Sequence, residues 1–190
     1  PRAGLGVPNV ADVFSNLGFL LAGGWGVAVV WRRRALLGEA FPAWLLFAVS
    51  VAACAVGSTL YHLAPDDARL VWDRLPIALA CAGLLVAVRA EARPGREPRA
   101  ALALTAAFAG ASVAWWALTN GPGGEGDLRP YLLIQTLPLV LVPIWLAIRS
   151  APRGEVLAFA GALALFMLAR VFELADHAVF ADGVLIPVRY

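Results

Sequence analysis

The sequence predicts an all-α fold, a polytopic bundle of transmembrane helices that forms one domain over residues 1–190. Two observations lead to this prediction. Apolar residues make up 61% of the chain, and its mean hydropathy is +0.77. Charged residues make up only 15%, against roughly 25% in ordinary soluble domains. A soluble fold of this size could not bury so much apolar surface, whereas helices in a bilayer can expose it to lipid.

The apolar residues fall into runs of the length that crosses a bilayer. A membrane-spanning helix needs about 20 predominantly apolar residues. Short breaks rich in Pro, Gly and charged residues separate the runs. The predicted spans are 13–31, 43–62, 71–88, 100–118, 131–148 and 156–174. Cys54 and Cys81 lie inside two of them and are interpreted as small core residues, not as a disulfide.

The charges in the loops predict the orientation of the bundle. Positive residues favour the cytoplasmic side of a membrane. Nine arginines follow spans one, three and five, whereas most acidic residues lie on the other side. The arginines are Arg32, Arg33, Arg34, Arg89, Arg93, Arg96, Arg99, Arg149 and Arg153. We therefore expect the N-terminus outside, and this explanation of the basic residues leaves no case for nucleic-acid binding.

A line of three polar residues interrupts this hydrocarbon-rich sequence. Ser58 and His62 are four residues apart, so they share one face of a helix. Asp73 lies near the start of the next span, at the same end of the bundle. Ionisable groups at membrane depth are costly and suggest a functional site.

Each of these residues also has a structural interpretation. His62 can be satisfied by a carbonyl, and Ser58 can bond back to a helix carbonyl. Asp73 can cap the third helix or pair with Arg74. In the first helix, Asp12 is predicted to be the N-cap, and Asn16 is interpreted as a polar link between helices.

The last span contains a second polar stripe. Arg170, Glu173, Asp176 and His177 are spaced so that they lie largely on one helix face. They form either an internal salt-bridge set that pins this helix at the interface or a wall of the cavity that His62 faces. The two interpretations are compatible.

Two segments of the chain carry a family resemblance: Gly57-Ser58-x-x-Tyr61-His62-x-x-Pro65, followed by Trp72-Asp73-Arg74-Leu75-Pro76. They resemble the alkaline ceramidase family and, more broadly, the CREST superfamily of seven-helix membrane hydrolases and adiponectin-receptor-like proteins. The family pattern is a Ser, a His four residues on, and an Asp eleven beyond the His. Further similarity to bacterial members lies in Val7-Pro8-Asn9, Ser15-Asn16-Leu17-Gly18-Phe19 and Glu173-x-x-Asp176-His177.

The resemblance implies a zinc-dependent amide hydrolase of the membrane. His62 would bind Zn²⁺, Asp73 would act as general base on a water molecule, and Ser58 would hold the oxyanion or that water. The substrate would be ceramide or a related lipid amide, with its acyl chain between helices. The absence of Lys and the similarity of the motifs to those of bacterial members favour a bacterial inner membrane, with the site facing the periplasm.

The family site needs more ligands than this sequence contains. Its zinc takes two further histidines from a His-x-x-x-His pair on a seventh helix, whereas this sequence has two His in total. We therefore expect the chain to be truncated at both ends, with the missing ligands beyond Tyr190.

Other function classes compete with this hypothesis. The main alternative is a receptor-like or structural membrane bundle of the same superfamily without turnover. A second alternative is a Ser-based hydrolase that uses Ser58 with His177. The sequence lacks the Gly-x-Ser-x-Gly elbow that would support it. A haem bound by two histidines, His62 and His177, is a further alternative. The predicted position of both residues near one membrane face argues against it.

Overall fold

The computed structural model describes residues 9–95, 98–121 and 126–181, and within these residues all regular secondary structure is helical. The six long helices coincide with the six predicted spans, so the all-α prediction is confirmed. A short helix and a 3₁₀ turn follow the first helix. The elements are α1 Val10–Arg32, α2 Arg34–Leu37, η1 Gly38–Ala40, α3 Phe41–Leu63, α4 Asp67–Ala92, α5 Pro98–Thr119, α6 Arg129–Ile148 and α7 Arg153–Ala181.

Five segments within the described residues are long and apolar enough to cross a membrane. They are Asp12–Arg32, Arg34–Leu63, Asp67–Ala92, Pro98–Thr119 and Arg129–Ile148. The sixth span, 156–174, lies on α7, where most side chains after 168 fall outside the described part, so it stays a prediction.

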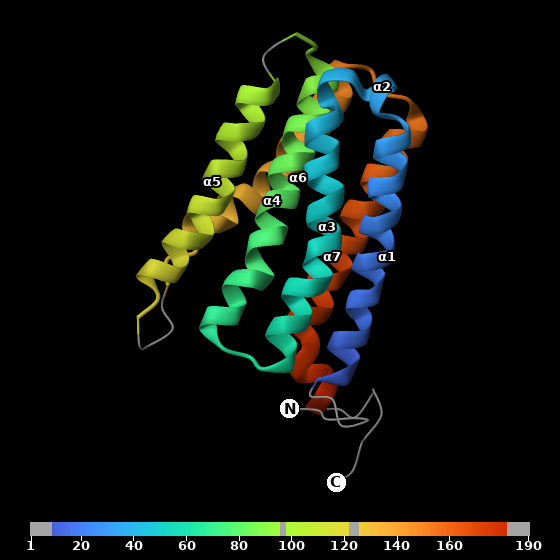
Figure 1. Ribbon diagram of the computed structural model, residues 1–190. Helices are drawn as coiled ribbons and strands as arrows, with labels where there is room; N and C mark the ends of the chain where they lie inside the picture. The colour runs from blue at the N-terminus through green and yellow to red at the C-terminus, as the bar shows by residue number, and fades with distance from the viewer. Residues whose placement is uncertain (1–8, 96–97, 122–125, 182–190) are drawn as a thin grey trace. The chain divides into compact units, whose positions relative to one another are not determined.

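The chain divides into two compact units, Pro1–Arg149 and Ser150–Tyr190, and each is described by itself. The second unit contains α7. In the first unit, the connections between the long helices alternate between two ends (Figure 1). We call one the Arg-rich end, because it holds Arg32, Arg33, Arg34, Arg93 and Arg149, and the other the polar end, because it holds the α3–α4 connection and the start of α6.

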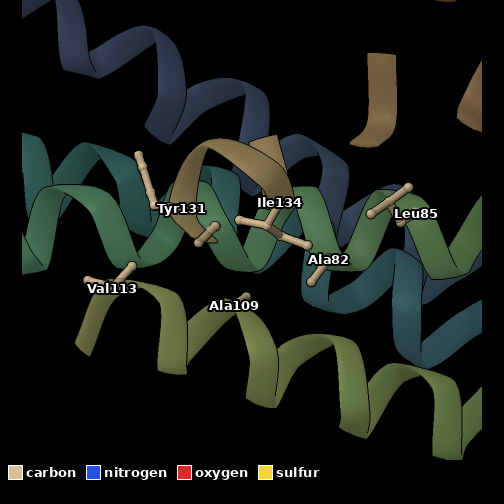
Figure 2. Close-up of a cluster of buried hydrophobic side chains, with 7 residues drawn as sticks. Ala82, Leu85, Ala109, Val113, Tyr131 and Ile134 are labelled. Carbon is tan, nitrogen blue, oxygen red and sulfur yellow. The ribbon is translucent and has the colours of Figure 1, made fainter. Parts of the chain in front are cut away.

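Helix α4 lies at the centre of the first unit, against α3, α5 and α6. Its small residues Ala78 and Ala82 let the neighbouring helices approach, and both are fully buried. Figure 2 shows the resulting core, to which α4, α5 and α6 all contribute. The buried residues are Ala78, Ala82, Leu85, Ala109, Val113, Tyr131 and Ile134. Cys54 is buried and Cys81 half-buried, and both are free thiols, as predicted.

Side-chain pairs tie the helices together at the Arg-rich end. The indole of Trp44 donates a hydrogen bond to Glu91 at 2.7 Å, and Arg149 pairs with the same carboxylate at 3.1 Å. The three residues come from α3, α4 and the end of α6. Glu91 thus connects α3, α4 and the end of α6 at the Arg-rich end of the unit.

Candidate functional site

The structure places Ser58 and His62 in the last two turns of α3, at the polar end. Both are partly buried, and the side chain of His62 is 30% exposed. Asp73 is partly buried on α4, the neighbouring helix. The predicted grouping of these residues at one end of one unit is therefore correct.

A glycine brings the two helices into backbone contact at this level. A Cβ atom on Gly57 would lie 2.0 Å from the carbonyl oxygen of Trp72 and 3.3 Å from the Cα of Asp73. No side chain fits there, so only glycine allows this approach. Since Ser58 follows Gly57 directly, the contact sets the serine and Asp73 on adjoining stretches of the two helices.

The three side chains lie at the same end of the unit but do not bond to one another. Among the described residues, none of Ser58, His62 and Asp73 makes a hydrogen bond to another of the three, and Ser58 does not bond back to a helix carbonyl. Their polar atoms are thus brought to the same end of the unit by the backbone alone.

The first helix supplies a carboxylate to the site. Oδ2 of Asp12 lies 3.9 Å from Nδ1 of His62, and the two form an ion pair when the imidazole is protonated. The amide of Asn9 donates a hydrogen bond to the backbone carbonyl of His62 at 2.8 Å. Two residues at the start of α1 therefore contact His62, one at its side chain and one at its backbone.

The prediction that Asp12 caps the first helix is wrong. Helix α1 begins at Val10, with Asn9 as its N-cap residue, so Asp12 already lies in the first helical turn. There its carboxylate faces the partial positive charge of the helix N-terminus as well as His62. The sequence offered a capping pattern but no signal for a partner 50 residues away.

The suggestion that Asp73 caps the third span is also wrong. Asp66 caps α4, accepting a hydrogen bond from the backbone N–H of Arg69 at 2.7 Å. The helix begins at Asp67, before the predicted start at residue 71. Asp73 therefore lies about 9 Å along the helix from its first residue, at a rise of about 1.5 Å per residue.

A groove lies between the membrane-spanning helices α1 and α3. It has a volume of about 400 Å³ and is almost entirely apolar. Its one polar link joins Asn16, which is 4% exposed, to Thr59, with 3.2 Å between the amide nitrogen and the hydroxyl oxygen. The predicted role of Asn16 between helices is thus confirmed. The lining residues are Val13, Phe14, Asn16, Leu17, Leu20, Ala55, Val56, Thr59 and Leu60.

Arg74 is a charged residue that the sequence indicated only as a partner for Asp73. Its guanidinium carbon lies 3.8 Å from the ring centre of Trp116 and 5.6 Å from that of Tyr131. Both rings are buried. The signal that could have found this arrangement is the arginine itself, seven residues inside an apolar helix.

The side chains that could bind a metal are spread through the described part of the chain. They contain no group of three His, Cys, Asp or Glu side chains that could hold a metal ion. A catalytic zinc takes three protein ligands, so His62 with the carboxylates near it does not fit a zinc site by itself. The side chains of Arg170, Glu173, Asp176 and His177 lie outside the described part, although α7 runs through these positions.

Comparisons with family models, curated proteins and solved structures gave no match to this chain.

Proposed function

We propose that this protein is an integral membrane hydrolase that cleaves the amide bond of a lipid such as ceramide. The observation that supports it most is the contact of Gly57 with the backbone at Trp72 and Asp73. It brings the stretch of α3 that carries Ser58 against the stretch of α4 that carries Asp73, in the order of the motif that resembles alkaline ceramidases. A partly buried ionisable group such as Asp73 within a membrane-spanning helix is costly and is typical of functional sites.

The residues have distinct roles in this proposal. The Asp73 carboxylate accepts a proton from the water that attacks the amide carbonyl. The hydroxyl of Ser58 donates a hydrogen bond to the carbonyl oxygen as negative charge develops on it. The Asp12 carboxylate lies 3.9 Å from Nδ1 of His62, and Nε2 is the ring nitrogen left for a further ligand.

A zinc ion at His62 is part of the proposal, although the described residues do not complete its coordination. A carboxylate at the second ring nitrogen of a histidine is the usual support for a metal ligand, because it fixes the tautomer and the ring orientation. The pairing of Asp12 with His62 is consistent with that role. The two further ligands would have to come from outside the described residues.

The lipid chain has a suitable surface beside this site. The apolar groove between α1 and α3 is lined by Thr59 and Leu60, which lie between Ser58 and His62 in the same helical turn. Its volume of about 400 Å³ is within the range of ligand pockets. We propose that the acyl chain lies here, with the amide at the polar end. This end faces the periplasm of a bacterial inner membrane if the Arg-rich end is cytoplasmic.

The test is release of fatty acid from a fluorescent ceramide by the full-length protein in detergent micelles. Asp73→Asn is expected to lower turnover about 100-fold or more, since a general base contributes about 10²–10⁴. Asp67→Asn is the matched control, because Asp67 is an exposed acid on the same helix. It should turn over like the wild type.

Zinc content is measured on the same preparations. We expect about one zinc per chain by mass spectrometry, lost together with activity in His62→Ala. Full turnover by Asp73→Asn, or no turnover of any lipid amide by the wild type, would contradict the hydrolase. Absence of turnover would favour the receptor-like or structural bundle.

A further inference from the structure

Arg74 is a cation held in a rigid aromatic setting at the polar end, between α4, α5 and α6. One face of its guanidinium lies on the ring of Trp116 at 3.8 Å. The same indole lies close to Gly126, where a Cβ atom would come within 2.6 Å of Cδ1 and Nε1 of the ring. The buried indole is thus closely packed, and the guanidinium lies over it.

No acceptor within the described structure satisfies this guanidinium. Arg74 makes no hydrogen bond and no ion pair there, and its Nη1 atom is fully buried without a partner. Asp73 and Asp67, the carboxylates whose charge acts on Arg74, form no ion pair with it. Arg74 as a whole is only half-buried, and its Nε and Nη2, which also make no hydrogen bond, are not among the fully buried atoms of the described residues.

Arg129 shows how the Nε and Nη2 atoms of a guanidinium bind a carboxylate. At the same end of the unit, Nε and Nη2 of Arg129 both donate to the carboxylate of Asp127, each at 2.8 Å. This two-pronged geometry matches carboxylate and phosphate oxygens. Arg74 presents the same pair of donors with no carboxylate opposite them.

We propose that Arg74 is a binding site for a phosphate group, which accepts hydrogen bonds from Nε and Nη2. The position favours the headgroup of a membrane phospholipid as the source. Arg74 lies about 10 Å along α4 from Asp67, and helical side chains lean back towards the N-terminus, here the polar end. The phosphate therefore sits at the depth where headgroups meet the apolar core. This proposal does not depend on the proposed hydrolysis.

The test measures lipid binding to the full-length protein in detergent by native mass spectrometry. The probes are dioleoylphosphatidylglycerol and dioleoylglycerol, which differ in the phosphate-bearing headgroup. We expect the phospholipid to bind and the diacylglycerol not to bind. Arg74→Gln should weaken phospholipid binding about tenfold or more, since a hydrogen bond to a charged group contributes about 1.5–3 kcal/mol.

Two further variants keep the result interpretable. Arg129→Gln is the matched control, because that guanidinium is already occupied by Asp127, and it should bind the phospholipid like the wild type. Arg74→Lys keeps the cation over Trp116 but loses the two-pronged edge. It should melt at the wild-type temperature and bind several-fold more weakly, which separates lost binding from lost folding.

Inorganic phosphate distinguishes the two sources of the ligand. If millimolar phosphate displaces the phospholipid, the site takes free phosphate as well; if it does not, the headgroup in its lipid is the ligand. Wild-type binding by both Arg74 variants would overturn the proposal. So would equal weakening in Arg74→Gln and Arg129→Gln, or equal binding of dioleoylglycerol.

Discussion

The single hydrogen atom that forms the side chain of Gly57 sets the distance between α3 and α4 at the candidate site. Two other glycines act in the same way further along the unit. A Cβ on Gly23 would lie 2.3 Å from the backbone nitrogen of Ala52, and one on Gly83 would lie 2.7 Å from that of Phe47. Without a strong hydrophobic force between helices in lipid, such close approach is what makes packing favourable.

Replacing Gly57 should therefore damage both packing and site geometry. In Gly57→Ala the new methyl would clash with the Trp72 carbonyl, so the helices must separate. We expect a loss of about 1–3 kcal/mol, typical of overpacking, seen as a lower melting temperature in detergent.

Gly24→Ala is the control for that variant, because a Cβ there meets no described atom within 4 Å. It should melt at or slightly above the wild-type temperature, since Ala is the better helix former. Equal melting temperatures for the two variants would show that the α3–α4 contact is looser than described.

At the scale of the elements, the turn between α5 and α6 is closed by one carboxylate. Asp127 accepts hydrogen bonds from the Arg129 side chain and backbone, and from the indole of Trp115 at 3.0 Å. Its own backbone N–H donates to the hydroxyl of Thr119 at 2.9 Å. One residue thus joins the end of α5 to the start of α6, and these are the helices that carry the aromatic partners of Arg74.

This turn gives the stability a dependence on acidic pH. The Arg129 hydrogen bonds, with help from Trp115, lower the pKa of Asp127 far below its usual range. A lowered folded-state pKa stabilises the fold above the unfolded pKa of about 3.9, and the contribution is lost as pH falls through the folded value.

Melting temperatures between pH 2 and 7 test this expectation on the wild type and Asp127→Asn. The difference between them should be constant above about pH 5 and shrink below about pH 4. The gap should be modest, because the pair is at the surface and is screened by solvent. A difference that grows towards acidic pH would have the wrong sign and would refute the role of the carboxylate.

At the scale of the whole molecule, the connections of the first unit separate into two chemically different ends. The Arg-rich end carries most of the basic residues, and the polar end carries Asp66, Asp67 and Asp127 with the candidate site (Figure 1). This separation within one unit agrees with the alternation that the loop charges predicted. That the Arg-rich end is cytoplasmic stays a prediction based on the positive-inside rule.

Cysteine labelling in intact cells tests that orientation. Asp67→Cys and Pro94→Cys place one thiol at each end, in a background where Cys54→Ala and Cys81→Ala remove the native thiols. A membrane-impermeant maleimide should label Asp67→Cys in intact cells but label Pro94→Cys only after permeabilisation. The opposite pattern would place the Arg-rich end outside.

The positions of the helices could be predicted from the sequence, because runs of apolar residues and the breaks between them are local properties. The predicted spans 43–62 and 100–118 match α3 and α5 to within two residues at each end. The sequence also indicated Ser58, His62 and Asp73, because polar residues are conspicuous in apolar runs, although the start of α4 was placed four residues late. Whether these residues catalyse a reaction stays a prediction.

The partners of these residues could not be predicted and became visible only in the folded structure. Asp12 and His62 are 50 positions apart, and Arg74 meets Trp116 and Tyr131 across more than 40. No local pattern encodes such pairs, since they depend on which helix faces meet and how closely. That closeness follows from backbone contacts such as Gly57 against Trp72, which exist only once the helices have packed.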